Sequence, residues 1–106
     1  MKKEIKEMKE AMIRRKAIEI LEKDRYRVWY PPRVKWIKEG DIFGVFDLIC
    51  CRKSSIKFIQ LTSLSNIRAR EKKILAFLKP NKIKLNSEVW GYNQKKRKFK
   101  IVKVGP

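Results

Sequence analysis

Two apolar runs of strand length, followed at once by a helical pattern, constrain the fold of this chain more than any other feature. The runs cover residues 44–51 and 56–62, and the polar tetrapeptide RKSS joins them. Such a pair predicts a β-hairpin. From Ser63 or Ser65, either of which is a suitable N-cap, apolar residues recur at helical spacing until Pro80 blocks the helix. The middle of the chain therefore predicts two strands and then a helix.

The flanking segments complete a mixed pattern. In chain order they predict a helix over 2–23, a short strand over 26–30, a loop over 33–43, and a hairpin of strands 88–92 and 99–104 around a basic loop. The order of elements is then αβββαββ. Strands between two helices indicate an α/β or α+β domain with a mixed central sheet flanked by helices. The length, 106 residues, is that of a single domain over 1–106.

The positive charge is unevenly distributed along the chain. The formal net charge is +18; residues 1–47 contain 13 basic and 9 acidic side chains, and residues 48–106 contain 16 basic and 2 acidic ones. Such an excess destabilises a folded chain through self-repulsion, and its commonest rationale is an anionic partner. Nucleic acid is the leading partner, with DNA favoured over RNA, ahead of a ribosomal particle or an anionic membrane surface.

Several kinds of chemistry are excluded by composition. The chain has no histidine, and its two cysteines, Cys50 and Cys51, are adjacent in an apolar strand. Neighbours in a strand point to opposite faces, so a disulfide between them and a structural zinc site are not expected. Histidine bases and triads are absent as well. No membrane span or secretory signal is visible, so a cytoplasmic protein without membrane contact is expected.

Asp47 is an acidic residue in a segment that otherwise has a buried pattern, and Gln60 and Thr62 lie two apart on the next expected strand. Period-two alternation places Gln60 and Thr62 on one face. If the hairpin register brings Asp47 beside them, the three form a set of hard oxygen ligands suited to Mg²⁺ or Mn²⁺. A structural interpretation stays open, in which Asp47 caps a turn or pairs with an arginine and the other two end an edge strand.

Basic side chains follow this hairpin. The expected nucleic-acid contacts are a stripe on the second helix and a loop near the C-terminus, namely Asn66, Arg68, Arg70, Lys72, Lys73, Lys95, Lys96, Arg97 and Lys98. The helical stripe follows Thr62 after only a few residues, so its first turn should lie next to the polar set, where helix N–H groups favour a phosphate. Both groups are equally compatible with a solvated, charged surface.

The segments DIFGVFDLI, from Asp41, and FIQLTS, from Phe58, resemble the PD-(D/E)xK nuclease superfamily, whose motif is an Asp, a strand turn, and then Glu or Gln, any residue and Lys. The resemblance implies a restriction endonuclease-like core. Asp47 matches the metal-binding Asp, Gln60 matches the second position, and Thr62 falls where the catalytic lysine is expected. Asp41 is an additional candidate metal ligand.

A closer similarity is to small phage-associated and bacterial proteins of this fold. Pieces of the form Phe-Gly-x-x-Asp, Gln-x-Thr-Ser, Asn-x-x-x-Arg-x-x-Lys and Val-Trp-Gly-aromatic occur here in the same order, over roughly residues 10–104. The glutamate that archaeal Holliday-junction resolvases carry on their first helix has no clear counterpart, since Arg14 falls near its place; Glu19 or Glu22 could substitute. Lys73 is the candidate to replace the missing lysine.

The resemblance implies an endonuclease that cleaves DNA with Mg²⁺ or Mn²⁺, acting on branched or phage DNA. Its catalytic residues are then Asp47, Gln60, Thr62 and Lys73, with Arg70 stabilising phosphate charge. The alternative is a nuclease-fold module that has lost catalysis at Thr62 and binds DNA or RNA through its basic face. A structural accessory of a phage or ribosomal particle is a third hypothesis. Relatives that act on symmetric junctions are often dimers, so a homodimer is also an expectation.

Overall fold

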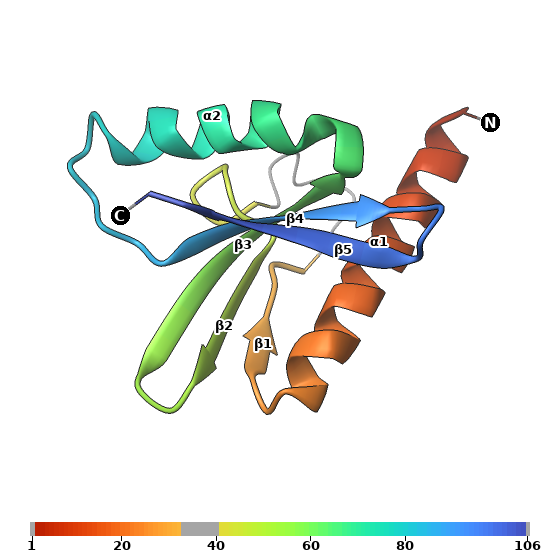
Figure 1. The fold of residues 1–106 in the computed structure, drawn as a ribbon, viewed down its shortest axis with the longest axis horizontal. Helices are drawn as coiled ribbons and strands as arrows, with labels where there is room; N and C mark the ends of the chain where they lie inside the picture. The colour runs from red at the N-terminus through yellow and green to blue at the C-terminus, as the bar shows by residue number, and fades with distance from the viewer. Residues whose placement is uncertain (1, 33–40, 106) are drawn as a thin grey trace.

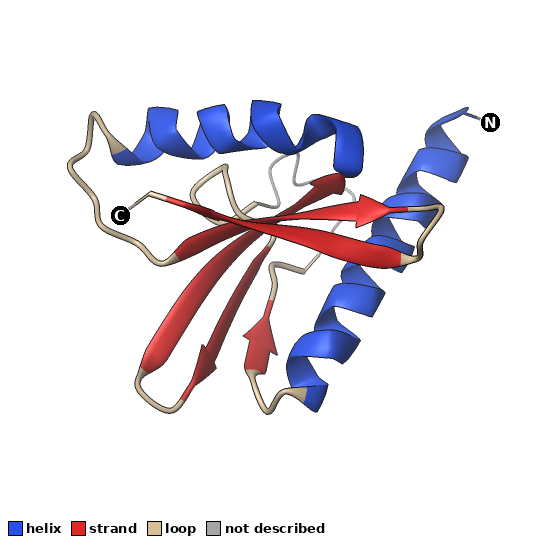
Figure 2. Cartoon of the chain, viewed as in Figure 1, coloured by secondary structure: helices blue, strands red, loops and turns tan. Residues whose placement is uncertain are grey.

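The computed structural model describes residues 2–32 and 41–105. It contains a five-stranded mixed sheet and two helices (Figures 1 and 2). The helices and strands, in chain order, are α1 (Lys2–Lys23), β1 (Arg27–Trp29), β2 (Leu48–Arg52), β3 (Ser55–Ser63), the 3-10 turn η1 (Leu64–Asn66), α2 (Ile67–Leu78), β4 (Ser87–Asn93) and β5 (Lys98–Val104). The expectation of a mixed α and β domain is confirmed. No helix in these described ranges is long and apolar enough to cross a membrane.

The strands lie in the order β1-β2-β3-β4-β5. β1, β2 and β3 are successively antiparallel, β3 and β4 are parallel, and β5 returns antiparallel to β4. Parallel neighbours need a long connection, and α2 supplies it by crossing from the end of β3 to the start of β4. Leu48 pairs with Ile59, so the start of β2 lies beside the later half of β3.

One face of the sheet packs against α1. Ala17 and Leu21 of the helix join a core cluster with Leu48, Cys50 and Ile59 of the strands, and all five are buried. Burial raises the pKa of the Cys50 thiol to about 11, because the charged thiolate loses its hydration. The neighbouring cysteine points to the opposite face and is exposed, and both are free thiols, as the alternation predicts.

The other face packs against α2. Ile67, Ile74 and Leu78 of this helix contact a cluster that includes Val89 of the central sheet. Gly91 of β4 lets the start of the helix approach closely: a Cβ there would overlap the side chain of Ile67 and lie 3.3 Å from the Cα of Leu64 in η1. A glycine at this position therefore holds η1 and the first turn of α2 directly against the sheet.

The expected strand over 44–51 begins late. Residues from Asp41 to Phe46 form a tight turn instead, with an isolated bridge between Ile42 and Phe46. Its backbone has positive φ at Phe43 (57°) and Gly44 (69°), which ends any extended run. Asp47 therefore precedes β2 rather than lying within it. Val45 and Phe46 are apolar, as expected of a buried strand, and both are indeed buried, but they belong to the turn.

Two further expectations needed correction. The hairpin turn is tighter than four residues, since Arg52 pairs directly with Ser55. Neither Ser63 nor Ser65 caps α2, because η1 comes between and the N-cap is Asn66, without a side-chain capping hydrogen bond. The two serine hydroxyls lie 3.4 Å apart and bond to each other. Most of the expected loop over 33–43 lies outside the described residues.

Candidate functional site

A pocket of about 390 Å³ opens at the end of the sheet where β2 begins and β3 ends. Figure 1 shows the arrowhead of β3 reaching the first turn of α2 at this end. Four elements contribute to the lining, which consists of Lys9, Glu10, Ile13, Arg14, Asp41, Asp47, Gln60, Leu61, Thr62, Ser63, Asn66 and Arg70. The pocket thus gathers the polar set of the hairpin, part of α1 and the beginning of α2.

Asp47 is fixed from two directions. Its backbone N–H donates to the carbonyl of Ile59 at 2.9 Å, which continues the β2–β3 ladder by one residue. Its Oδ2 accepts the backbone N–H of Leu61 at 2.7 Å and Nε2 of Gln60 at 2.9 Å. Hydrogen bonds to a carboxylate are stronger than neutral ones. The carboxylate is therefore held at the pocket by β3, so the condition that the hairpin register places Asp47 beside Gln60 is met.

Gln60 is 4% exposed, and its amide has a defined orientation. Nε2 donates to Oδ2 of Asp47 and, at 3.1 Å, to the carbonyl oxygen of Leu61. Both partners are acceptors, so the amide nitrogen and not the oxygen must face them. The amide oxygen Oε1 is then left buried, with no hydrogen-bond partner among the described residues. Such a group costs about 1–3 kcal/mol.

Thr62 lies on the same face as Gln60 and is 8% exposed, so the expected alternation is confirmed. β3 pairs with β2 on one side and β4 on the other. The interpretation that Gln60 and Thr62 merely end an edge strand is therefore wrong. Two polar side chains stay buried in the centre of the sheet and face a pocket, which is an unusual use of interior positions.

The first helix contributes charged residues that the sequence interpretation missed. Glu10, Lys9 and Arg14 line the pocket, whereas Glu19 and Glu22, the expected substitutes for a helix glutamate, do not. The helical spacing held a signal for this. Glu10 lies one turn before buried Ile13, on the stripe that continues through the buried residues of α1. The docking of that stripe beyond the end of the sheet was not visible in the sequence.

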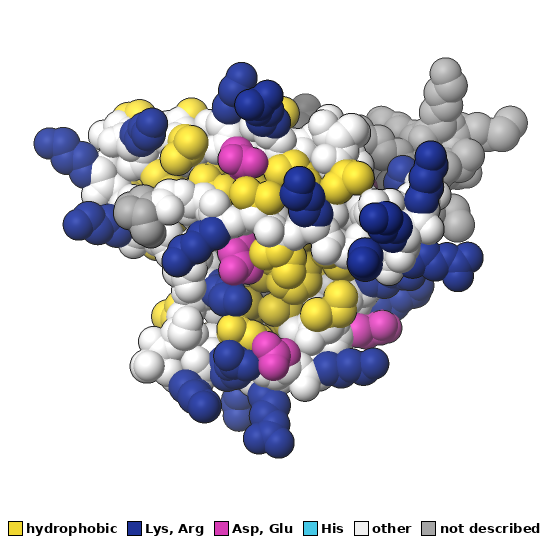
Figure 3. All heavy atoms as spheres, in the orientation of Figure 1, with side chains coloured by type: hydrophobic (Ala, Val, Ile, Leu, Met, Phe, Trp, Pro, Cys, Tyr) yellow, Lys and Arg dark blue, Asp and Glu magenta, His cyan; other side chains and the backbone are white. Residues whose placement is uncertain are grey.

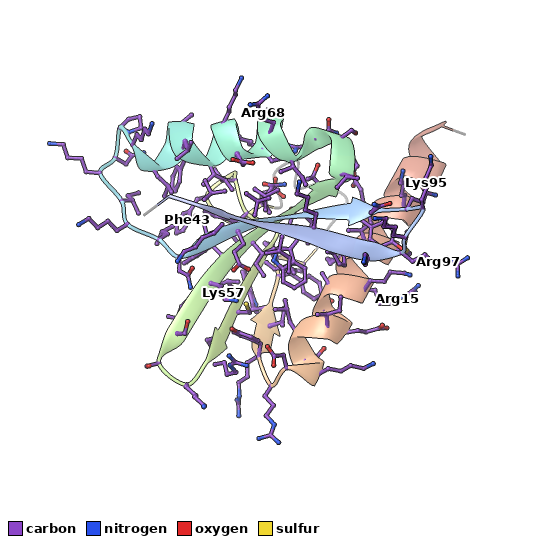
Figure 4. The ribbon with its side chains drawn as sticks, viewed as in Figure 1. Arg15, Phe43, Lys57, Arg68, Lys95 and Arg97 are labelled. Carbon is purple, nitrogen blue, oxygen red and sulfur yellow. The ribbon has the colours of Figure 1, made fainter. Side chains whose placement is uncertain are left out.

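The expected nucleic-acid contacts divide into three groups. Asn66 and Arg70 line the pocket. Arg68, Lys96 and Lys98 line a second cavity instead. Lys72, Lys73, Lys95 and Arg97 line neither, and all four are exposed; Figure 4 labels Arg68 on α2, and Lys95 and Arg97 at the turn between β4 and β5. Lys73 therefore lies outside the lining of the pocket that holds Asp47.

The pocket contains oxygen donors of the kind that a divalent cation binds. Within residues 2–32 and 41–105, no group of three or more His, Cys, Asp or Glu side chains is close enough to hold a metal ion. Asp41 and Asp47 nevertheless share the pocket with the unsatisfied Oε1 of Gln60 and the hydroxyl of Thr62. Carboxylate, amide and hydroxyl oxygens are the ligands of Mg²⁺ and Mn²⁺, so these residues fit such an ion chemically.

The lining of the pocket contains three basic and three acidic side chains. Lys9, Arg14 and Arg70 line it beside the carboxylates. Figure 3 shows Lys and Arg side chains around a hydrophobic area on the visible face, with few acidic ones. Comparisons of the chain with protein-family models, with curated proteins and with solved structures found no match.

Proposed function

We propose that the protein is a metal-dependent endonuclease of the PD-(D/E)xK type, acting on DNA. One observation carries the proposal: the buried Oε1 of Gln60 has no hydrogen-bond partner among the described residues, while its Nε2 bonds the carboxylate of Asp47. A buried acceptor left unsatisfied beside a fixed carboxylate is a feature of sites that bind a cation or a donor. The two residues are those that resemble the first and second positions of the nuclease motif.

The fold supports this proposal. A meander of three antiparallel strands is followed by a helix and a parallel fourth strand, and the motif residues meet at one end of the central pair. A restriction endonuclease-like core is the arrangement that the resemblance implies. The polar set then stands at the end of the sheet from which α2 departs, next to a helix terminus that favours phosphate.

Within this proposal, Asp47, Asp41 and Oε1 of Gln60 would hold Mg²⁺ or Mn²⁺, and the bound ion supplies an activated water and a polarised phosphate. Arg14 and Arg70 bind the phosphate and stabilise the charge that develops on it. Lys9 is the lysine in the lining of the pocket, so it is a better candidate than Lys73 for the role of the missing motif lysine.

The test is cleavage of labelled linear, single-stranded, flapped and four-way-junction DNA with Mg²⁺ or Mn²⁺. We expect Asp47→Asn to lower cleavage by about 100-fold or more, the scale of losing one electrostatic stabiliser, because the shape is kept and the charge is lost. Asp24→Asn is the matched control, since Asp24 pairs with Arg52 and lies outside the pocket. Cleavage that survives undiminished in Asp47→Asn would contradict the proposal.

A second candidate function is a nucleic-acid-binding module on the same fold, without catalysis. Two observations favour it: Thr62 stands where the motif has lysine, and Oδ2 of Asp47 already accepts two hydrogen bonds. This candidate predicts affinity for DNA or RNA that falls steeply with salt and needs no divalent ion. Binding without cleavage of any of the four DNA substrates would favour it.

A further inference from the structure

A second cavity, of about 670 Å³, opens between the start of α2 and the β4–β5 hairpin. Its charged lining is strongly basic: Arg68, Lys96, Lys98 and Lys100 stand against a single acid, Glu71. None of these four basic side chains forms a salt bridge within the described part of the chain, where the ion pairs join Arg52 to Asp24 and Lys57 to Glu88. We call this cavity the hairpin groove. The charged residues that line it therefore sum to +3.

The position of the basic side chains follows from the strand geometry. Lys98 and Lys100 are two apart in β5 and therefore point to the same face, toward α2. Lys96 lies in the turn before them, and its backbone N–H, like that of Lys95, donates to Oδ1 of Asn93. Arg68 faces them from α2. The groove thus has cations on both of its walls, held by a strand, a closed turn and a helix.

We propose that the hairpin groove binds the sugar-phosphate backbone of a nucleic acid. Its concave shape suits a chain of phosphates better than a flat bilayer, and its apolar lining at Leu64 and Val102 offers contact to sugars. The first turn of α2 contains no acidic residue and no capping side chain, which leaves the positive end of the helix beside the groove uncompensated. The proposal rests on the nucleic-acid half of the proposed function and not on catalysis.

The groove and the first pocket share a wall. η1 contributes Leu64 and Ser65 to the groove and Asn66 to the pocket. A nucleic acid seated in the groove would therefore lie beside η1, which also borders the pocket at Asp47. The groove then acts as a holding site next to the proposed catalytic pocket, and the two sites are separable by mutation because their charged residues differ.

The test compares two triple variants that remove equal charge. Lys96→Gln, Lys98→Gln and Lys100→Gln remove the cations of one wall of the groove, whereas Lys79→Gln, Lys84→Gln and Lys103→Gln remove three exposed lysines that line neither cavity. Affinity for a labelled DNA duplex is measured against salt concentration, and circular dichroism checks folding. We expect the groove triple to bind at least about tenfold more weakly and to lower the salt slope by about 2–3, with a slope change below about 1 for the control.

Arg68→Gln, on the opposite wall, provides an independent variant if the triple folds poorly, and its slope should fall by about 1. Equal losses in the two triples would overturn the proposal, because charge alone would then explain binding. Unchanged DNA affinity with lost binding to anionic phospholipid vesicles or to an acidic peptide would overturn it too. The outcome is independent of cleavage: a groove triple that loses affinity supports the groove even when no variant cleaves DNA.

Discussion

The two cavities beside η1 differ in the charges of the side chains that line them. The pocket at Asp47 combines carboxylates with basic side chains and contains a buried amide oxygen that lacks a partner among the described residues, whereas the charged residues of the hairpin groove are basic except for Glu71. A mixed-charge site with buried polar atoms has a use for a divalent ion, since the cation neutralises carboxylates that would otherwise repel a phosphate. A cationic groove has no such need. Under the two proposals, the pocket at Asp47 is the site of cleavage and the hairpin groove is a site of nucleic-acid binding.

The largest expected effect concerns removal of divalent ions. Under the proposed function, chelation with EDTA should abolish cleavage by the wild-type protein, because the bound ion would supply the activated water. Affinity for a DNA duplex should change by less than about twofold, because lysines and arginines bind phosphate without a metal. Cleavage assays and anisotropy titrations on one preparation measure both. Loss of affinity together with cleavage would remove the distinction between the cavities.

Gln60→Glu should increase the difference in metal dependence between the two cavities, because it gives the pocket at Asp47 another carboxylate. The concentration of Mg²⁺ that half-saturates cleavage should fall about tenfold, since added ligand charge raises affinity for hard cations. Without metal, the free energy of unfolding should fall by about 2–3 kcal/mol, because the bond from Nε2 to Asp47 is replaced by repulsion. Thermal melts with and without Mg²⁺ test this. Gln94→Glu, in the exposed β4–β5 turn, should change neither quantity.

Gly91→Ala should disturb both cavities at once. The added Cβ overlaps Ile67 and crowds Leu64, so η1 must move away from β4. We expect a loss of about 1–3 kcal/mol in the free energy of unfolding, as for other overpacked positions, and weaker DNA binding. Denaturant titration measures the first. The double variant Gly91→Ala/Ile67→Ala removes the main overlap, so its loss of stability should be smaller than the sum of the losses of the two single variants. Strictly additive losses would show that η1 is not held by this contact.

The smallest expected effect concerns Cys50, which lies in the core between α1 and the sheet and lines neither cavity. The pKa of Cys50 is raised to about 11 in the folded chain, so its contribution to stability is present below the unfolded pKa and is lost as pH rises. Between about pH 8 and pH 10 the free energy of unfolding should fall by about 1–1.5 kcal/mol from this thiol. Denaturant melts of wild type and Cys50→Ala measure the difference. A wild-type curve that is no steeper than that of the variant would contradict it.

Local periodicity was sufficient to predict part of the hairpin half of the site. Gln60 and Thr62 had to share a face because they are two apart in a strand. Asp47 was expected beside them only if the hairpin register allowed it, and the pairing of Leu48 with Ile59 provides that register. Those are relations between close neighbours in the chain. The prediction that this strand begins at Gly44 is wrong, because positive φ at Phe43 and Gly44 turns the chain there although the segment is apolar.

The other half of the site depends on packing between distant segments, and the sequence did not contain it in readable form. Glu10 and Arg14 reach the pocket because α1 docks with its early turns beyond the end of the sheet, which depends on how Ala17 and Leu21 seat on the strands. The division of the basic residues has the same origin. Arg68 and Arg70 are two residues apart on α2, and about 200° of helical rotation sends them to different cavities.

Because η1 is a wall of both cavities, any ligand that displaces it acts on the affinity of the other cavity as well. The turn has three residues, and β4 supports it through the space left by Gly91. Thermodynamic linkage makes the influence reciprocal: the factor by which a divalent ion at Asp47 alters binding in the groove equals the factor by which a groove ligand alters binding of the ion. One short turn would then couple the two binding equilibria of the domain.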